Sequence, residues 1–380
     1  MTTHPDPIYL DHNATTPVLP EVMEAMLPYL STHFGNPSSS HVYGRRTREA
    51  VEQARAQVAD LIGAVPNEIV FTSGGIEANN LAIRGVAQAA PAGRHIVTSV
   101  IEHPATEGPC TFLEAEGWRV TRLGVDELGR VSLVRAKEAL TPGVTLLTIM
   151  HANNETGVLQ PVTELAGLAR ELGILVHTDA AQSAGKVPVR VHDLGVDLLS
   201  LVGHKLYAPK GIGALYVRRG TLIHPLLLGS PGDLRPGTLN TPSIVGLGAA
   251  CAAASRDLDA ESARLLQMRH ELWERLQAAI PGIRLNGHAT ERLPNTLNVS
   301  FPGVSGNAVL TSAPGIAAAT GAACHAGSER ASAVLLAMGL DPAEALGAVR
   351  LSLGRLVAAA QIPEIAQILK DAWCEAKKKS

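Results

Sequence analysis

The sequence predicts an α/β fold in which helices cover both faces of a mostly parallel sheet. Between residues 68 and 217, short apolar runs alternate with segments whose apolar residues recur at helical spacing. This alternation is typical of parallel sheets, because each connection between parallel strands needs a crossover, usually a helix. The composition agrees, since 46% of the residues are hydrophobic, only 3% are aromatic, and glycine occurs 36 times. Such a composition favours an α/β protein over a β-sandwich.

These patterns place the expected elements along the chain. A short strand is expected near residue 9, followed by helices over residues 20–30 and 47–62, with a turn at 34–41 between them. The sheet strands are expected at 68–72, 95–100, 119–123, 144–150, 174–178, 196–202 and 214–217, and the helices between them at 76–90, 105–116 and 162–172. A long helical segment over 242–279, with a break near 257–259, is expected to lead into a second unit. That unit would contain elements at 293–301, 333–338 and 349–353.

Length, charge and cysteine usage narrow the class of protein. A chain of 380 residues exceeds one ordinary core, so we expect a large domain over residues 16–255 and a small one formed by 1–15 and 256–380. The net charge of −3, with dispersed basic residues, argues against nucleic-acid binding. There is no apolar run of membrane-span length, no signal-peptide pattern and no CxxC pair among the four cysteines. We therefore expect no membrane segment, no metal site and a cytoplasmic location.

Lys205 follows the expected buried strand at 196–202 and precedes a turn rich in proline and glycine. Lysine forms Schiff bases with carbonyl compounds, although a lysine after a strand is more often an ordinary surface residue. Polar residues also follow other expected strands, at 73–77, 102–103, 151–157 and 177–182. Ligands bind at the carboxyl ends of parallel strands, and the small-residue turn at 73–75 before a helix suits a phosphate. These strand ends together predict an enzyme site at one edge of the sheet.

With these residues in view, the chain resembles the cysteine desulfurases of the NifS/IscS type. These are pyridoxal-phosphate enzymes of the class V aminotransferase group, and selenocysteine lyases are close relatives. The resemblance extends from residue 8 to about residue 355, with matching segments at 9–17, 34–39, 71–75, 151–157, 177–182, 203–205, 235–242, 321–325 and 350–355. It implies a homodimeric fold-type-I enzyme that holds pyridoxal 5′-phosphate, converts L-cysteine to L-alanine and delivers sulfur to an acceptor protein.

The resemblance also implies a role for each matching residue that would hold the cofactor. Lys205 would form the Schiff base and move protons, Asp179 would pair with the pyridine nitrogen, and His103 would stack on the ring and transfer protons. Gln182 and Asn154 would bond the side of the ring that carries the phenolic oxygen. The phosphate would be held by the amides of Gly74, Gly75 and Ile76, by His204, and by Thr238 of a second subunit.

For the substrate, the resemblance implies that Arg350 binds the carboxylate, with Asn13 and Asn154 beside it. A planar guanidinium suits that task better than an ammonium group. Cys324, in a loop of small residues, would attack the substrate sulfur as a thiolate and carry it as a persulfide. A lone cysteine is more often an inert small hydrophobe, and that is the interpretation we give to Cys251. Packing within a helix is the corresponding expectation for Cys110, and Cys374 is expected to be incidental.

Three positions depart from the family pattern. Ile76 and Val202 stand where hydroxyl residues are common, and the loop at 229–235 is altered and shorter. Loss of a hydrogen bond to a charged group costs about 1.5–3 kcal/mol, so we expect weaker retention of the cofactor than is usual for the family. Two alternatives to a desulfurase stay open, namely a selenocysteine lyase and a cofactor-poor pseudoenzyme that acts as a binding partner. An ordinary aminotransferase would leave Cys324 without a task.

Overall fold

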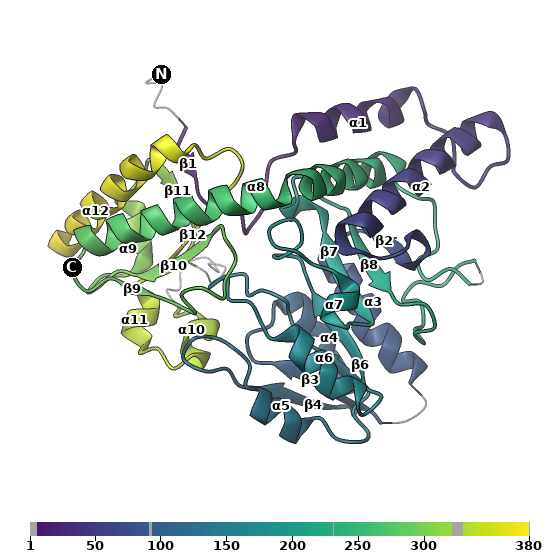
Figure 1. Cartoon of the computed structure of the whole chain (residues 1–380), viewed down its shortest axis with the longest axis horizontal. Coiled ribbons are helices and arrows are strands. Elements are labelled where there is room, and N and C mark those ends of the chain that lie inside the picture. The colour runs from purple at the N-terminus through teal and green to yellow at the C-terminus, as the bar shows by residue number, and fades with distance from the viewer. Residues whose placement is uncertain (1–5, 91–92, 231, 321–329, 380) are drawn as a thin grey trace.

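The computed structural model describes residues 6–90, 93–230, 232–320 and 330–379. Its largest sheet has seven strands in the order β2-β8-β7-β6-β5-β3-β4 (Figure 1). These strands are β2 (Ile69–Thr72), β3 (His95–Ser99), β4 (Arg119–Leu123), β5 (Leu146–Thr148), β6 (Leu175–Asp179), β7 (Leu198–Val202) and β8 (Gly213–Val217). Every neighbouring pair from β7 to β4 is parallel, whereas β8 runs antiparallel to both of its neighbours. The predicted mostly parallel sheet is confirmed.

Helices cover both faces of this sheet. Successive residues of a strand point to opposite faces, and here the residues on both faces are apolar and need to be covered. Leu146 and Leu198 pack with α3 (Gly75–Ala89) and α4 (Pro104–Ala115) on one face. Their neighbours Leu147 and Leu199 pack on the other face with α2 (Val42–Ile62), α6 (Val162–Arg170) and the first half of α8 (Thr241–Ala279). The remaining helices of this part are α1 (Pro20–Ser31), α5 (Leu133–Ala139) and α7 (Val191–Leu194).

Helix α8 is 39 residues long and extends from the seven-stranded sheet to the other end of the molecule (Figure 1). The predicted break near residues 257–259 is wrong. Residues 249–279 contain neither glycine nor proline, and Arg256 and Asp257 form ion pairs at the surface of the helix. Arg256 pairs with Glu21 at 3.1 Å, and Asp257 accepts from Arg355 Nη1 at 2.8 Å. The charged residues near 257 therefore lie on the surface of a continuous helix.

The second half of α8 packs on a three-stranded antiparallel sheet and on the C-terminal helix. The sheet has the order β12-β10-β9, with β9 (Arg284–Leu285), β10 (Thr296–Ser300) and β12 (Ala348–Ser352). Near it, β1 (Ile8–Tyr9) pairs in parallel with β11 (Ile316–Ala317). The other elements are α9 (Gly306–Thr311), α10 (Ala333–Ala337), α11 (Pro342–Leu346) and α12 (Ile362–Lys379). The chain start and chain end thus belong to one core, while the domain boundaries after residues 15 and 255 stay predictions.

No helix within the described ranges has both the length and the apolar character that crossing a bilayer requires. The three terminal lysines at 377–379 form the exposed last turn of α12.

Candidate active site

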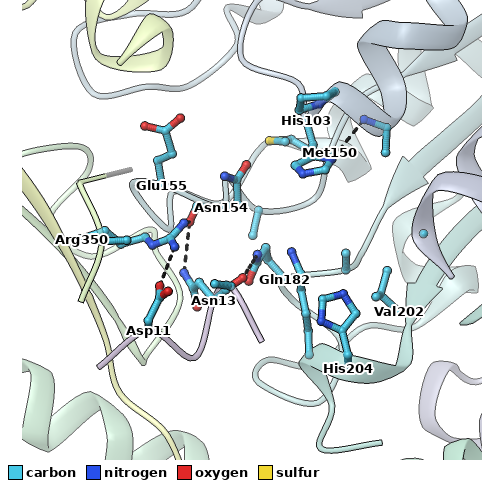
Figure 2. A pocket seen from close by; sticks show the side chains of 18 of the residues that line it. Asp11, Asn13, His103, Met150, Asn154, Glu155, Gln182, Val202, His204 and Arg350 are labelled. Atoms are coloured by element: carbon cyan, nitrogen blue, oxygen red, sulfur yellow. Dashed lines mark hydrogen bonds and ion pairs between the residues drawn. The ribbon is translucent and has the colours of Figure 1, made fainter. Parts of the chain in front are cut away.

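A cavity of about 710 Å³ lies where the carboxyl ends of the sheet strands meet the second part of the molecule (Figure 2). A volume of this order is typical of small-molecule sites. Ten of the residues singled out from the sequence line it, namely Asn13, Gly75, Ile76, His103, Asn154, Asp179, Gln182, His204, Lys205 and Arg350. Gly74 and Thr238 are not among the described lining residues. Cys324 lies outside the residues that the structure describes.

Lys205 and Asp179 reach this cavity from the ends of neighbouring strands. Asp179 is the last residue of β6, and Lys205 lies in the short turn of 3-10 helix that follows β7. Burial lowers the pKa of the Lys205 ammonium to about 8, while the nearby Asp179 carboxylate acts in the opposite direction. About a tenth of this amine is therefore neutral, and nucleophilic, at pH 7, and about half at pH 8.

Asn79, on α3, holds the Asp179 carboxylate and was missed from the sequence. Its Nδ2 donates to Oδ2 of Asp179 at 2.7 Å, and the backbone N–H of Ala181 donates to Oδ1 at 2.8 Å. The two carboxylate oxygens are thereby fixed, and the carboxylate faces the cavity in one orientation. No local sequence pattern predicts this contact, because the two residues are 100 positions apart in the chain.

The two histidines of the site are both neutral near pH 7. His103 caps the N-terminus of α4, where its Nδ1 accepts from the backbone N–H of Ala105 at 3.1 Å, so the ring proton is on Nε2. Burial, and then the charge of Lys205, lowers the pKa of His103. Burial likewise lowers the pKa of His204 to about 4, and its Nδ1 lies 3.2 Å from Thr15 Oγ1. Each ring is thus a hydrogen-bonding group and not a cation.

The turn before α3 has the form expected of an anion site. Gly74 has φ 147°, a conformation that favours glycine, and its N–H lies 3.4 Å from Thr72 Oγ1. The amides of Gly75 and Ile76 follow in the first helical turn, where N–H groups have no helical partner. A Cβ on Gly75 would meet Val202 Cγ2 at 2.6 Å, so the apolar Val202 packs directly against this turn. Of the three predicted amides, the geometry therefore offers chiefly those of Gly75 and Ile76.

The altered loop at 229–235 is fastened to the same turn through its last residue. Arg235 Nε donates to Glu77 Oε1 at 2.9 Å, and the other oxygen of Glu77 accepts from the backbone N–H of Ser73 at 2.7 Å. Glu77 is in the first turn of α3, where the positive end of the helix dipole favours a carboxylate. The loop thus contacts the turn before α3 although it is shorter than the family pattern.

Arg350, on β12, closes the opposite side of the cavity (Figure 2). Its Nη2 donates to Asp11 Oδ1 at 2.7 Å and its Nη1 to the backbone oxygen of Asn154 at 3.0 Å. Its buried Nε has no partner among the described residues. Asn13 Nδ2 donates to the same Asn154 oxygen at 3.2 Å. Asp11, which the sequence analysis missed, is an internal counter-ion that a bound carboxylate would meet at this guanidinium.

The cysteines that the structure describes have the character expected of them. Cys110 and Cys251 are buried, and burial raises the pKa of each thiol to about 12. Neither supplies a thiolate near neutral pH. Cys374 lies on α12 and is partly exposed.

Comparisons with known proteins identify the family to which the chain belongs. The family model described as aminotransferase class-V matches residues 8–365. A cysteine desulfurase IscS of Dictyoglomus turgidum is 47% identical over 352 residues, covering 91% of this chain and 89% of its own. Two solved structures are similar. A NifS-like protein has a TM-score of 0.91 and 33% identity, and the match covers 97% of this chain and 100% of its own. SspA in complex with cysteine has a TM-score of 0.81 and 40% identity, and the match covers 91% of this chain and 98% of its own.

These names favour a cysteine desulfurase over a selenocysteine lyase or a non-enzymatic relative. The NifS-like neighbour also confirms the expected fold-type-I architecture. The sequence resemblance is confirmed, and the chain belongs to the class V aminotransferase family, in its cysteine desulfurase branch.

Proposed function

We propose that the protein is a pyridoxal-phosphate-dependent cysteine desulfurase that converts L-cysteine to L-alanine and retains the sulfur as a persulfide on Cys324. The observation that carries the proposal is that three side chains line one cavity. They are Lys205, whose pKa is lowered to about 8, Asp179, whose two oxygens each accept a hydrogen bond, and the buried Arg350. The cysteine in the similar SspA structure supports L-cysteine as the substrate.

The residues of the cavity fit pyridoxal phosphate. Lys205 offers a partly neutral amine to the aldehyde, and Asp179 offers a fixed carboxylate to the ring nitrogen. Gln182 and Asn154 would lie on the phenolic-oxygen side, His103 against the ring, and the amides of Gly75 and Ile76 with His204 at the phosphate. When bound, the cofactor supplies an electron sink for the α-carbon of the amino acid.

Around such a ligand, the protein's side chains bind, orient and move protons. The Asp179 carboxylate, which Asn79 holds in one orientation, would favour a proton on the ring nitrogen through its negative charge. With its amine free, Lys205 would take the proton from the α-carbon of the substrate as a general base. His103 carries its proton on Nε2 and can donate a hydrogen bond through it, since its Nδ1 accepts from the Ala105 amide.

Arg350 would bind the substrate carboxylate through the face of its guanidinium that is not used by Asn154. Asp11 competes for the same guanidinium, so substrate binding exchanges one carboxylate for another. In the sulfur-transfer step the Cys324 thiolate attacks the substrate sulfur. A sulfur–sulfur bond forms as the carbon–sulfur bond breaks, and the electron pair of that bond stays with the substrate carbon, which gains a proton. L-cysteine and one thiol thus become L-alanine and one persulfide.

Apo protein is expected to capture pyridoxal phosphate faster as the pH rises, with half of the increase reached at about pH 8 and a plateau above it. Only the neutral amine attacks the aldehyde, and the Lys205 pKa is lowered to about 8 by burial, whereas an ordinary lysine has a pKa of about 10.4. The neutral fraction therefore rises through pH 8 and then levels. Stopped-flow absorbance measures the rate at which the visible band of the bound cofactor grows. The rate with butylamine under the same conditions corrects for the pH dependence of the aldehyde itself. A corrected rate that keeps rising toward the ordinary lysine pKa would contradict it.

Substituting Ile76→Thr is expected to strengthen cofactor binding. Ile76 is 67% exposed, lines the cavity and lies in the first turn of α3, where a hydroxyl could donate to the phosphate. A hydrogen bond to a charged group contributes about 1.5–3 kcal/mol, which predicts roughly tenfold or greater tightening. Retention after dialysis measures it, and Ile76→Val, which has the shape without the hydroxyl, is the matched control. Equal retention in both variants would show that the missing hydroxyl is not what weakens binding.

Alanine release from L-cysteine in the presence of a reducing thiol tests the proposed activity, with L-serine as the matched substrate that lacks sulfur. Release of alanine from L-cysteine but not from L-serine supports the proposal. The rate with L-selenocysteine then gives the preference between the sulfur and the selenium substrate. A reconstituted protein that shows no visible cofactor band and no alanine would contradict it. Homodimerisation with Thr238 of the partner subunit at the phosphate, an acceptor protein for the sulfur and a cytoplasmic location belong to the same proposal.

A further inference from the structure

Lys186 is a second buried lysine beside the site, and the proposed mechanism gives it no task. It lies just after β6 and is 8% exposed. Its Nζ donates to the backbone oxygen of Gln182 at 2.9 Å and to Oε1 of the same side chain at 3.3 Å. The charged groups that act on it most strongly, Lys205 and Arg350, are both cations. Burying an amine among like charges is costly, so its hydrogen bonds call for an explanation.

Those hydrogen bonds fix one end of the Gln182 amide, and Asn13 fixes the other. Gln182 Nε2 donates to the backbone oxygen of Asn13 at 3.0 Å (Figure 2). The amide group has two donor hydrogens on nitrogen and an acceptor oxygen. Since Oε1 faces Lys186 and one Nε2 hydrogen faces Asn13, the second Nε2 hydrogen is the group left for a ligand in the cavity that Gln182 lines.

We propose that Lys186 is a positioning residue that holds the Gln182 amide so that it presents a hydrogen-bond donor to the ligand. The reverse orientation would set the Gln182 oxygen against the Asn13 carbonyl, a repulsive contact, and would lose the hydrogen bond that Oε1 accepts from Lys186. The inference rests on the proposed cofactor, whose phenolic oxygen needs a donor, and not on the proposed substrate. It adds to the proposed site a residue that acts on the ligand through Gln182.

Several charged groups surround Lys186, and they decide how it can be tested. Lys186 and Lys205 both line a second cavity of about 20 Å³, together with Glu261 and Arg355. The charge of Lys186 also acts on His12 and His204, and Arg350 acts on Lys186. Because many groups titrate here, a pH profile of one variant would mix their effects. A double-variant comparison with Gln182 isolates the step that the proposal names.

The experiment measures the affinity of apo protein for pyridoxal phosphate and the wavelength of the bound cofactor's visible band. It compares wild type, Lys186→Met, Gln182→Ala and the double variant. Lys186→Met is expected to weaken binding about tenfold, the scale of one net hydrogen bond, and to shift the band in the same direction as Gln182→Ala. The double variant is expected to match Gln182→Ala alone. Lys137→Met, on the exposed side of α5, is the matched control and is expected to match wild type.

Two results would overturn the inference: Lys186→Met with wild-type affinity and band, or effects of Lys186→Met and Gln182→Ala that add in the double variant. A purely structural lysine would instead lower the thermal midpoint equally in both backgrounds and leave the band in place. If Lys186→Met does not fold, Lys186→Gln supplies the same comparison, because it keeps a polar group in the turn without an ammonium. Wild-type protein that binds no cofactor would contradict the proposed function itself, and this separates the two failures.

Discussion

Replacing Lys205 by alanine is expected to remove the visible band of the bound cofactor and to lower alanine release by more than about a thousandfold, the scale on which loss of an enzyme nucleophile acts. Lys205 lines the cavity with a pKa lowered to about 8, so it is the amine best prepared to bind an aldehyde and to move a proton at the substrate carbon. The absorption spectrum of reconstituted protein and the alanine assay are the two readouts.

Lys137→Ala is the matched control for this substitution, because Lys137 is exposed on α5. It is expected to keep both band and activity. Lys186 is the other buried amine beside the cavity, and it has its own hydrogen bonds to Gln182. A visible band that survives in Lys205→Ala would mean that a different amine, with Lys186 the first candidate, binds the aldehyde.

The second large effect is expected for Asp179→Asn. The substitution keeps the shape of the side chain but removes its charge, so the proton on the cofactor's ring nitrogen loses its counter-ion. It also places an NH2 group against one of two donors, Asn79 Nδ2 or the Ala181 amide. Loss of one preorganised electrostatic partner in an active site typically costs about 10²–10³ in kcat, and we expect a loss of at least that size.

Steady-state kinetics of the reconstituted variant measure this, together with its thermal midpoint. Asp197→Asn is the control, because Asp197 likewise accepts from a backbone amide, that of Val176 at 2.9 Å, but does not line the cavity. It is expected to keep the activity of wild type. An Asp179→Asn protein that retains kcat within tenfold would show that the ring nitrogen needs no carboxylate partner.

The strand ends of the site were predictable because their signal is local. Apolar strands followed by polar residues indicated the segments at 177–182 and 203–205, and the family resemblance then assigned roles to Asp179 and Lys205. The fold brings both side chains to one cavity. The partners that orient these groups were not predictable in this way. Asn79 is 100 residues from Asp179, and Asp11 is 339 residues from Arg350, so only the folded chain pairs them.

The same distinction explains the errors in the fold. The expected break in α8 came from a run of charges at residues 256–259, whose ion pairs to Glu21 and Arg355 involve segments far away in the sequence. Helix α12 was not expected, although its apolar residues pack against the three-stranded sheet and α8. Lys186 was passed over because its hydrogen bonds run to a neighbouring residue whose importance appears only at the cavity.

The measurement that tests the central claim most directly compares wild type with Cys324→Ala in the release of alanine from L-cysteine under a reducing thiol. We predict that turnover disappears in the variant while the visible band of the bound cofactor stays, because the thiol that accepts the sulfur is gone and the cavity around Lys205 is intact. Equal turnover in both proteins would contradict the account, since Cys324 would then take no part in removing the sulfur.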